Sequence, residues 1–342
     1  MSLSDFRLST SPKAHTGPQS DRQSLLRSIT LYLHTLRREY HLKMETLLQV
    51  PYFADPSTLP GPIPSIEEIE SSPSRLNEYG APRTVRVGEH FVVKYGELVL
   101  ALEADNMMFI SKQTSIPVPQ VYAVFRSPVK PAILYIVMQY IHGNTLMAEW
   151  PTMSEAQKST VGKKLRSYLA QLRELPSPGY YGSRGRGHMP SGIFWDGLSA
   201  YLNPAISGPF ETEADLINGL VLKSRSTDEH NKRRGYKADF YAKSLPVVLR
   251  GHSPTFTHGD FQRKNIIVRR KEQKELAGHE DEYEVTLIDW EMAGWYPDYW
   301  EYSIAACAFR FDDDWPNKVG NILDPYLVEF PWLFNFIIEL WG

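Results

Sequence analysis

The sequence predicts an α+β fold with two lobes, a small amino-terminal lobe and a larger, mainly helical one. Strand-like patterns between residues 83 and 141 flank a single helical pattern, which predicts a small antiparallel sheet with one helix. From residue 154 onward helical patterns predominate. The chain has 342 residues, more than one small core needs, so a division into two lobes agrees with its length.

The first 73 residues are expected to precede the two lobes. Residues 1–20 are rich in Ser, Thr and Pro, which predicts a disordered tail. Apolar residues then recur at helical steps as far as Tyr40, opposite a basic face. They predict a helix packed on the main body, with a helix lying on a membrane surface as the alternative. The expected division is a tail over 1–20, a helical extension and proline-rich linker over 21–73, a small lobe over 74–140 and a large lobe over 141–342.

The small lobe is predicted from five segments in the order strand, strand, helix, strand, strand. Residues 83–87 ("RTVRV") and 90–96 ("HFVVKYG") are rich in β-branched residues and are separated by a Gly-Glu turn. Residues 97–113 have apolar side chains at helical spacing. Two further strand-like runs, "VPQVYAVFR" and "AILYIVMQYI", complete this lobe.

The large lobe begins with the clearest helical pattern of the sequence. Residues 154–175 start with a Ser cap and an early Glu, and keep apolar residues at helical spacing. Residues 176–210, rich in Gly, Pro and aromatic residues, are expected to form a structured loop. Helical patterns resume over 211–224 and 237–250, and an aromatic-rich helical segment ends the chain.

The composition argues against several classes of protein. A net charge of −3 gives no reason to expect nucleic acid or an acidic membrane as a partner. Cys307 is the single cysteine, so no internal disulfide can form, and its small apolar surroundings are typical of a packing residue. No apolar run reaches the roughly 18 residues of a membrane helix, and no signal sequence is recognisable. We therefore expect a cytoplasmic location.

Two stretches of the large lobe are expected to bring polar side chains together. Residues 266–268 and "YEVTLID" are strand-like, and the charged connection between them predicts a hairpin. Because a hairpin brings its ends together, Asn265, just before the first strand, should lie near Asp289, just after the second. His258 and Asp260 lie one loop turn upstream, in "THGDFQRKN".

This set of side chains is typical of a phosphoryl-transfer site. Two carboxylates and an amide oxygen suit Mg²⁺, which prefers oxygen ligands and usually keeps a phosphate as a further ligand. The catalytic loop of kinases has His-x-Asp, four residues and then Asn, and His258, Asp260 and Asn265 have the same spacing. Such a site also needs a carboxylate that orients and deprotonates the attacking hydroxyl group, which is the task of the Asp in the kinase loop.

The small lobe offers groups that would bind a nucleotide. Lys94 lies in a strand, as the phosphate-binding lysine of kinases does, and Glu103 in the following helix is favoured over Glu97 as its partner. The alternative for Lys94 is a solvent-facing lysine of an edge strand. "IVMQYIHGNTL" is typical of a hinge where adenine bonds to backbone groups near Gln139 and Ile141, with a plain strand exit as the alternative.

Taken together, these motifs resemble the aminoglycoside phosphotransferase-like family, a branch of the protein-kinase-like fold, and especially its fungal subgroup. The matching pieces span about residues 84–306 and include "FVVKYG", "IPVPQVY", "VMQYIHGNTL", "GPFETEADL", "THGDFQRKN" and "LIDWEMAGWYPDYWEY". The resemblance implies a bilobal protein-kinase-like fold with a small antiparallel sheet and helix, a mainly helical large lobe, and ATP and Mg²⁺ as cofactors.

The resemblance also implies a role for each polar residue of the motifs. Asp260 becomes the catalytic base, and Asn265 and Asp289 become ligands of Mg²⁺. From its place in the His-x-Asp motif, His258 is also expected to be a catalytic residue. Lys94 positions the phosphates and is braced by Glu103, while Glu301 braces the catalytic loop from below.

Four features leave alternatives open. No G-x-G-x-x-G is present, and the turn "VRVGEHF" offers only Gly88 to cover the phosphates. Glu291, in Asp-Trp-Glu, can assist the metal or cap the next turn. The aromatic residues over 295–302 can line a substrate wall or fill the core. The acidic run 312–314 can attract a cationic substrate or form a solvated helix start.

The expected function is ATP-dependent transfer of the γ-phosphoryl group to a hydroxyl group of a small molecule. A catalytically silent kinase-like scaffold and a protein kinase are the alternatives. Against a protein kinase, the sequence has no Ala-Pro-Glu and little room after Asp289 for a segment that binds peptides. We expect the acceptor pocket beside Asp260, enclosed by residues 179–210 and 295–301.

Overall fold

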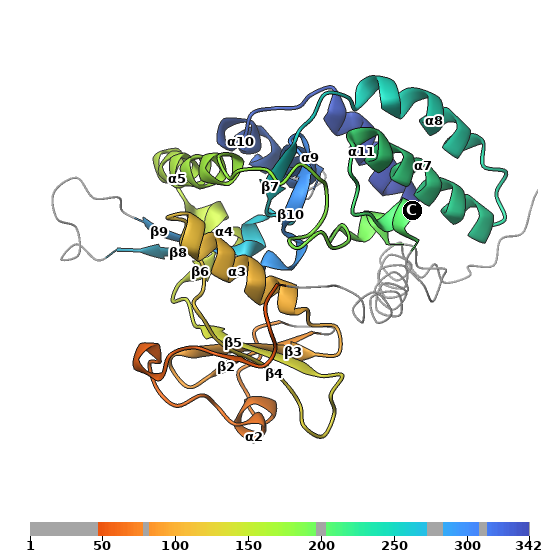
Figure 1. Ribbon diagram of the computed structural model, residues 1–342. Helices are drawn as coiled ribbons and strands as arrows, with labels where there is room; N and C mark the ends of the chain where they lie inside the picture. Colours follow the sequence, from red (N-terminus) through yellow and green to blue (C-terminus); the bar gives the residue numbers. More distant parts are fainter. Residues whose placement is uncertain (1–46, 78–81, 196–202, 272–282, 308–312, 342) are drawn as a thin grey trace, which may run out of the picture.

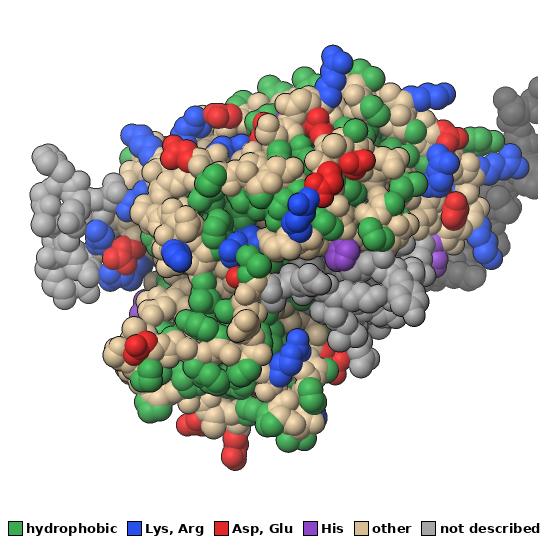
Figure 2. Space-filling view, in the orientation of Figure 1, with side chains coloured by type: hydrophobic (Ala, Val, Ile, Leu, Met, Phe, Trp, Pro, Cys, Tyr) green, Lys and Arg blue, Asp and Glu red, His purple; other side chains and the backbone are tan. Residues whose placement is uncertain are grey.

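The computed structural model describes residues 47–77, 82–195, 203–271, 283–307 and 313–341, arranged as a small and a large lobe (Figure 1). The expected tail over 1–20 and most of the expected helix after it lie outside these residues. None of the described helices is long and apolar enough to cross a membrane. Figure 2 shows acidic and basic side chains interspersed over one face of the molecule.

The small lobe is built on a five-stranded antiparallel sheet. Its strands, in spatial order, are β1 (Tyr52–Phe53), β4 (Val121–Arg126), β5 (Leu134–Gln139), β3 (Phe91–Gly96) and β2 (Arg83–Val87). The helix α3 (Ala101–Gln113) follows β3 and lies between the sheet and the large lobe (Figure 1). The predicted order of strand, strand, helix, strand, strand is therefore confirmed.

Residues 51–73, expected to form a linker, instead contribute to the small lobe. Tyr52 and Phe53 pair with β4, the short 3₁₀ helix η1 (Pro56–Thr58) follows, and α2 (Ile66–Glu70) packs beside the sheet. A capping box between Ser65 and Glu68 starts α2, and Ile69 is fully buried. Prolines punctuate this segment without preventing it from burying apolar side chains.

Alternation along β3 decides where Lys94 points. Successive residues of a strand face opposite sides of the sheet. Val93 and Tyr95 therefore enter the apolar cluster on the α2 side, together with Ile69. Lys94 lies on the other face, toward α3, and is buried rather than exposed at an edge.

The large lobe is mainly helical. Its helices are α4 (Leu146–Glu149), α5 (Glu155–Arg173), α6 (Pro204–Ser207), α7 (Glu213–His230), α8 (Tyr236–Val248), α9 (Trp300–Cys307), α10 (Trp315–Ile322) and α11 (Glu329–Trp341). The expected Ser154 cap of α5 forms a full capping box with Gln157. A second capping box, Thr212 with Asp215, starts α7, which runs six residues further than the predicted end at Ser224.

Two small antiparallel sheets of the large lobe carry the polar motifs. The predicted hairpin is formed by β8 (Ile266–Arg270) and β9 (Tyr283–Leu287), and β6 (Asn144–Thr145) adds a third strand. A separate pair is formed by β7 (Pro254–Thr257) and β10 (Gly294–Pro297). Each of the two loops that hold polar motifs therefore leaves one sheet and enters the other.

The aromatic segment after Asp289 belongs to the core. Tyr296, Tyr299 and Trp300 are fully buried and pack with side chains of α7, α8 and α11. Of the two alternatives for these residues, core packing is therefore the one that the structure bears out.

Candidate active site

The loop between β7 and β8 presents Asp260 with both carboxylate oxygens engaged. Oδ1 accepts a hydrogen bond from the side-chain amide of Gln262. Oδ2 accepts one from Asn265 Nδ2 at 2.8 Å and lies 3.2 Å from Lys264 Nζ. Burial raises the pKa of Asp260, and the ammonium of Lys264 opposes this effect. The carboxyl group is thus a stronger base than an exposed aspartate, held in a fixed position.

His258 supports this loop from inside the protein. Its side chain is buried, Nε2 lies 3.0 Å from the carbonyl oxygen of Ile288, and Nδ1 accepts a hydrogen bond from the backbone of Asp260 at 3.3 Å. Burial lowers the pKa of His258 to about 4, so the imidazole is neutral near pH 7. Both ring nitrogens therefore connect loop segments to each other.

Glu301, the first acidic residue of α9, lies below the same loop. Its carboxylate accepts hydrogen bonds from the backbone nitrogens of His258 at 2.6 Å and Gly259 at 3.2 Å. Burial raises the pKa of Glu301 to about 7, although the two backbone donors oppose the shift. The bracing role that the resemblance implies for Glu301 agrees with these contacts.

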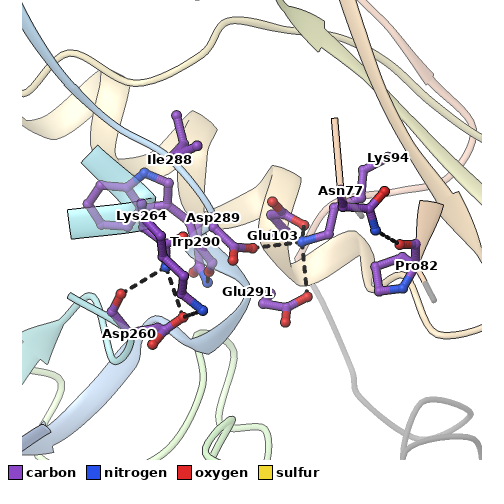
Figure 3. Close-up of polar contacts among 12 residues, drawn as sticks. Asn77, Pro82, Lys94, Glu103, Asp260, Lys264, Ile288, Asp289, Trp290 and Glu291 are labelled. Carbon is purple, nitrogen blue, oxygen red and sulfur yellow. Dashed lines mark hydrogen bonds and ion pairs between the residues drawn. The ribbon is translucent and has the colours of Figure 1, made fainter. Parts of the chain in front are cut away.

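Lys94 is surrounded by three carboxylates at the junction of the lobes (Figure 3). Its Nζ lies 2.7 Å from Asp289 Oδ1, 2.8 Å from Glu103 Oε2 and 3.1 Å from Glu291 Oε2. Burial alone would lower the pKa of Lys94, but the three carboxylates outweigh it and raise the pKa well above its ordinary value. Burial raises the pKa of Glu103 to about 7, against the attraction of Lys94.

The hairpin brings Asn265 and Asp289 together as its geometry predicts. The backbone nitrogen of Ile288 donates to the carbonyl oxygen of Asn265 at 3.0 Å, and Asp289 follows directly in a left-handed conformation with φ of 65°. One carboxylate and one amide from these residues are oxygen donors of the kind that Mg²⁺ prefers. Ligand atoms of Glu103, Asp289 and Glu291 also lie within 4.8 Å of one another.

Backbone hydrogen bonds attach the predicted hinge to the sheet of the small lobe. The backbone nitrogen of Tyr140 donates to the carbonyl oxygen of His90 at 2.8 Å, and that of Gln139 donates to Gln120. Among the described residues, the backbone nitrogen of Ile141 has no hydrogen-bond partner. It is therefore available to the edge of a planar base.

Gly88 lies at the opposite end of β3 from Lys94, the residue expected to bind the phosphates. Its turn joins β2 to β3 at the hinge end of the sheet, beside His90 and Tyr140, because Phe91 pairs with Gln139. At the Lys94 end, Asn77 instead donates to the carbonyl oxygen of Pro82 at 2.6 Å and accepts from the backbone of Thr84 at 3.0 Å (Figure 3). Asn77 and Pro82 thus lie nearer to Lys94 than Gly88 does, and residues 78–81 between them lie outside the described part.

The acidic run after α9 is occupied by basic and aromatic partners. Asp313 pairs with the buried Arg263 of the loop between β7 and β8, and Asp314 accepts from Trp150 Nε1 at 2.8 Å and from Lys158 Nζ at 3.1 Å. Asp312 lies outside the described residues. The two described acids therefore anchor structure and leave little charge to attract a cationic substrate.

Two residues that the sequence did not single out fix α3 against the large lobe. Asn106 Nδ2 donates to the carbonyl oxygens of Trp290 at 3.0 Å and Ala293 at 3.1 Å. Arg184, from the loop over 179–192, pairs with Asp105 at 3.0 Å and lies 4.0 Å above the ring of Phe109. A polar residue three positions after Glu103, on the same helix face, was the available signal for Asn106.

Comparisons with known proteins agree with this geometry. A model of the phosphotransferase enzyme family matches residues 76–331. The fold is similar to the apo form of a thermostable mutant of aminoglycoside phosphotransferase APH(4)-Ia, with a TM-score of 0.52, 15% identity, and coverage of 80% of this chain and 87% of that chain. A ternary complex of such a mutant with AMP-PNP and hygromycin B gives a TM-score of 0.50, 16% identity, and coverage of 79% and 84%.

A third similar structure is a GDP complex of a variant of aminoglycoside 2′-phosphotransferase-IIIa. Its TM-score is 0.50, its identity 12%, and the match covers 78% of this chain and 81% of that chain. A search of curated protein sequences gave no significant match. At these identities, the structural likeness shows a shared aminoglycoside phosphotransferase-type, kinase-like fold.

Proposed function

Because this chain belongs to the phosphotransferase enzyme family, we propose that it transfers the γ-phosphoryl group of ATP, with Mg²⁺, to a hydroxyl group of a small molecule. One observation carries the proposal: Lys94, Asp260, Asn265 and Asp289 converge where the lobes meet. The similar structures named above contain AMP-PNP with hygromycin B, and GDP, which supports a nucleotide donor and a small acceptor.

Each residue of the site has a defined role in this proposal. Asp260 accepts the proton as the acceptor oxygen bonds to the γ-phosphorus, and the bond from that phosphorus to the bridging oxygen of ADP breaks. Asn265 and Asp289 would hold Mg²⁺, which supplies charge neutralisation at the phosphates. Lys94 turns from Asp289 toward the phosphates while Glu103 keeps it in place, and Gln139 and Ile141 would bind the base through their backbone.

We assign His258 a positioning role rather than a proton-transfer role. Both of its ring nitrogens are engaged with backbone groups, and it is buried with a lowered pKa. A general base must reach the proton that it removes, and no atom of the buried imidazole is free to do so.

The acceptor is proposed to be small because the connection from Asp289 to α9 is short. The 3₁₀ helix η6 (Trp290–Met292), β10 and α9 follow one another directly, and the residues of this segment are largely buried. A peptide substrate needs an exposed segment here on which to lie. This arrangement favours a compact acceptor beside Asp260.

The proposal is tested by calorimetry followed by a screen. Titrations with ATP and with GTP, each with and without Mg²⁺, should show binding that requires the metal. A library of small alcohols should then contain a compound that accelerates ATP consumption. Folded protein that binds neither nucleotide would refute the proposal. Tight binding with no consumption against any alcohol would favour the silent scaffold instead.

A further inference from the structure

We propose that Lys264 contacts the transferring phosphoryl group and acts as a second catalytic cation beside Lys94, an inference that rests on the proposed function. Lys264 belongs to the 3₁₀ helix η4 (Arg263–Asn265), directly before the proposed metal ligand Asn265. Its Nζ lies 3.2 Å from Asp260 Oδ2, and its side chain is 49% exposed (Figure 3). The ammonium group therefore contacts the proposed base and is also half-exposed to solvent.

The contacts of Asp260 indicate that Lys264 can be released from Oδ2 during the reaction. A carboxylate oxygen can accept two hydrogen bonds; Oδ1 accepts one, from Gln262, whereas Oδ2 already has two donors, Asn265 and Lys264. On Oδ2 the two partners differ: Asn265 is buried and also donates to the backbone oxygen of Asp260 at 2.9 Å. Lys264 is half-exposed on a flexible stem, so its contact is the one released at lower cost.

The charges of the site point to where Lys264 goes. Four carboxylates, of Glu103, Asp260, Asp289 and Glu291, face two ammonium groups in this part of the described chain. Lys94 is buried and already bound by three of them. Lys264 contacts Asp260 and directly precedes Asn265, so it lies beside both the proposed base and a proposed metal ligand.

The phosphoryl group would be transferred between the proposed metal ligands, Asn265 and Asp289, and the proposed base, Asp260. Its acceptor oxygen lies at Asp260, which takes the proton, and its leaving oxygen lies toward the metal ligands. Cations directed at the transferring group stabilise the negative charge on its equatorial oxygens. Lys264 stays protonated throughout and exchanges one anionic partner, Asp260, for another. The same exchange frees Asp260 once nucleotide is bound.

The experiment compares ground-state and transition-state mimics. Affinities of wild type, Lys264→Met and Lys264→Arg are measured for Mg²⁺-ADP alone and with aluminium fluoride, which imitates the phosphoryl group in transfer. Lys163→Met is the matched control, because Lys163 is an exposed lysine of α5. Thermal unfolding checks that each variant is folded.

For Lys264→Met we expect the affinity for Mg²⁺-ADP to stay within about twofold of wild type. Most of the increase in affinity that aluminium fluoride gives the wild type should be lost. Removing one preorganised donor typically lowers turnover by about 10²–10³-fold, and ATP consumption should fall in that range. Lys264→Arg should recover part of both, and Lys163→Met should resemble wild type.

Two outcomes would overturn the inference. One is that aluminium fluoride increases the affinity for Mg²⁺-ADP equally in wild type and Lys264→Met, or increases it in neither. Another is a change confined to the KM of an acceptor, which would make Lys264 an acceptor-binding residue. A wild type that binds no Mg²⁺-ADP would instead refute the proposed function itself.

Discussion

Asp260 and Asp289 carry the same charge, but the structure surrounds them differently. Asp260 is held by neutral amides and a half-exposed lysine, whereas Asp289 contacts the buried Lys94. We predict that Asp260→Asn leaves Mg²⁺-nucleotide affinity within about twofold and lowers turnover by about 10²–10⁴-fold. Asp289→Asn should weaken Mg²⁺-nucleotide binding itself. Calorimetry and steady-state rates separate the two, and equal losses of affinity in both variants would show that the roles are wrongly divided.

Gly259 is required at its position for two separable reasons. Its φ is +80°, and an added Cβ would overlap the backbone carbonyl of Met292. Gly88 has a φ of +61° with open space around it and is the matched control. Left-handed backbone costs either alanine about 1–2 kcal/mol. Gly259→Ala should lower the free energy of unfolding by about 1–3 kcal/mol more, because of the overlap. Urea denaturation measures both, and equal losses would contradict the prediction.

His258 and Glu301 are neighbours whose pKa values shift in opposite directions. The pKa of His258 falls to about 4, so the stability it contributes is present above pH 6.5 and is lost as pH falls toward 4. The pKa of Glu301 rises to about 7, so the stability it contributes is present below pH 4.5 and is lost as pH rises toward 7. Between pH 4.5 and 6.5 the two effects oppose each other.

When one of the two side chains is replaced, the pH dependence of stability that the other contributes should become visible. From pH 6.5 to pH 4.5, the free energy of unfolding of His258→Gln should rise by roughly 2 kcal/mol relative to wild type. That of Glu301→Gln should fall by a similar amount over the same range. Denaturant titrations across this range check both slopes. Profiles of both variants that run parallel to that of wild type would contradict the opposing shifts.

The sequence predicts the centre of the site better than its supports. Asn265 and Asp289 meet because they flank the two strands of one hairpin, a relation that is local in the chain. Asn106 and Arg184 act through partners more than 75 residues away. Spacing within one element contains no information about such partners, since they depend on how the lobes pack.

At the scale of elements, α3 is fixed to the large lobe by an ion pair buried at both ends. Arg184 and Asp105 are 16% and 9% exposed, whereas Arg186 in the same loop pairs with Glu211 on the surface. We predict that Arg184→Gln lowers the free energy of unfolding by about 3 kcal/mol, because it leaves Asp105 buried without its partner. It should also weaken nucleotide binding, since α3 carries Glu103. Arg186→Gln should cost less than about 1 kcal/mol.

A double-mutant cycle tests the same pair directly. Asp105→Asn combined with Arg184→Gln should cost clearly less than the sum of the single changes, because the second change removes a charge already left without a partner. Additive losses in chemical denaturation would show that the two side chains act independently.

Elements with strong periodicity were predicted closely, and those without it were missed. The strands and helix of the small lobe have the expected order, and α5 begins at its expected cap. The two-residue strands β1 and β6 are too short to show alternation, so only their partners reveal them. The turn at Gly88 lies between the two strands as predicted, but only strand pairing shows that it lies at the hinge end of the sheet, away from Lys94.

At the scale of the whole molecule, the short connection from Asp289 to α9 predicts which substrates are refused. We expect the purified protein to phosphorylate at least one small alcohol and no peptide in a large peptide library with the same Mg²⁺-nucleotide. The reason is that this connection forms a strand and a buried turn. Radiolabel transfer to both libraries measures the preference, and efficient labelling of peptides alone would support a protein kinase.

The fixed position of α3 has a consequence for inhibitors. Three contacts attach this helix to the large lobe: Asn106 with Trp290, Phe109 with Phe256, and Asp105 with Arg184 of the loop over 179–192. An inhibitor that binds a conformation with α3 displaced from the large lobe requires that displacement to be possible. In this protein three contacts would have to break together for α3 to move. We therefore expect inhibitors of this chain to compete with the nucleotide or the acceptor, where they can contact Lys264 and Glu291.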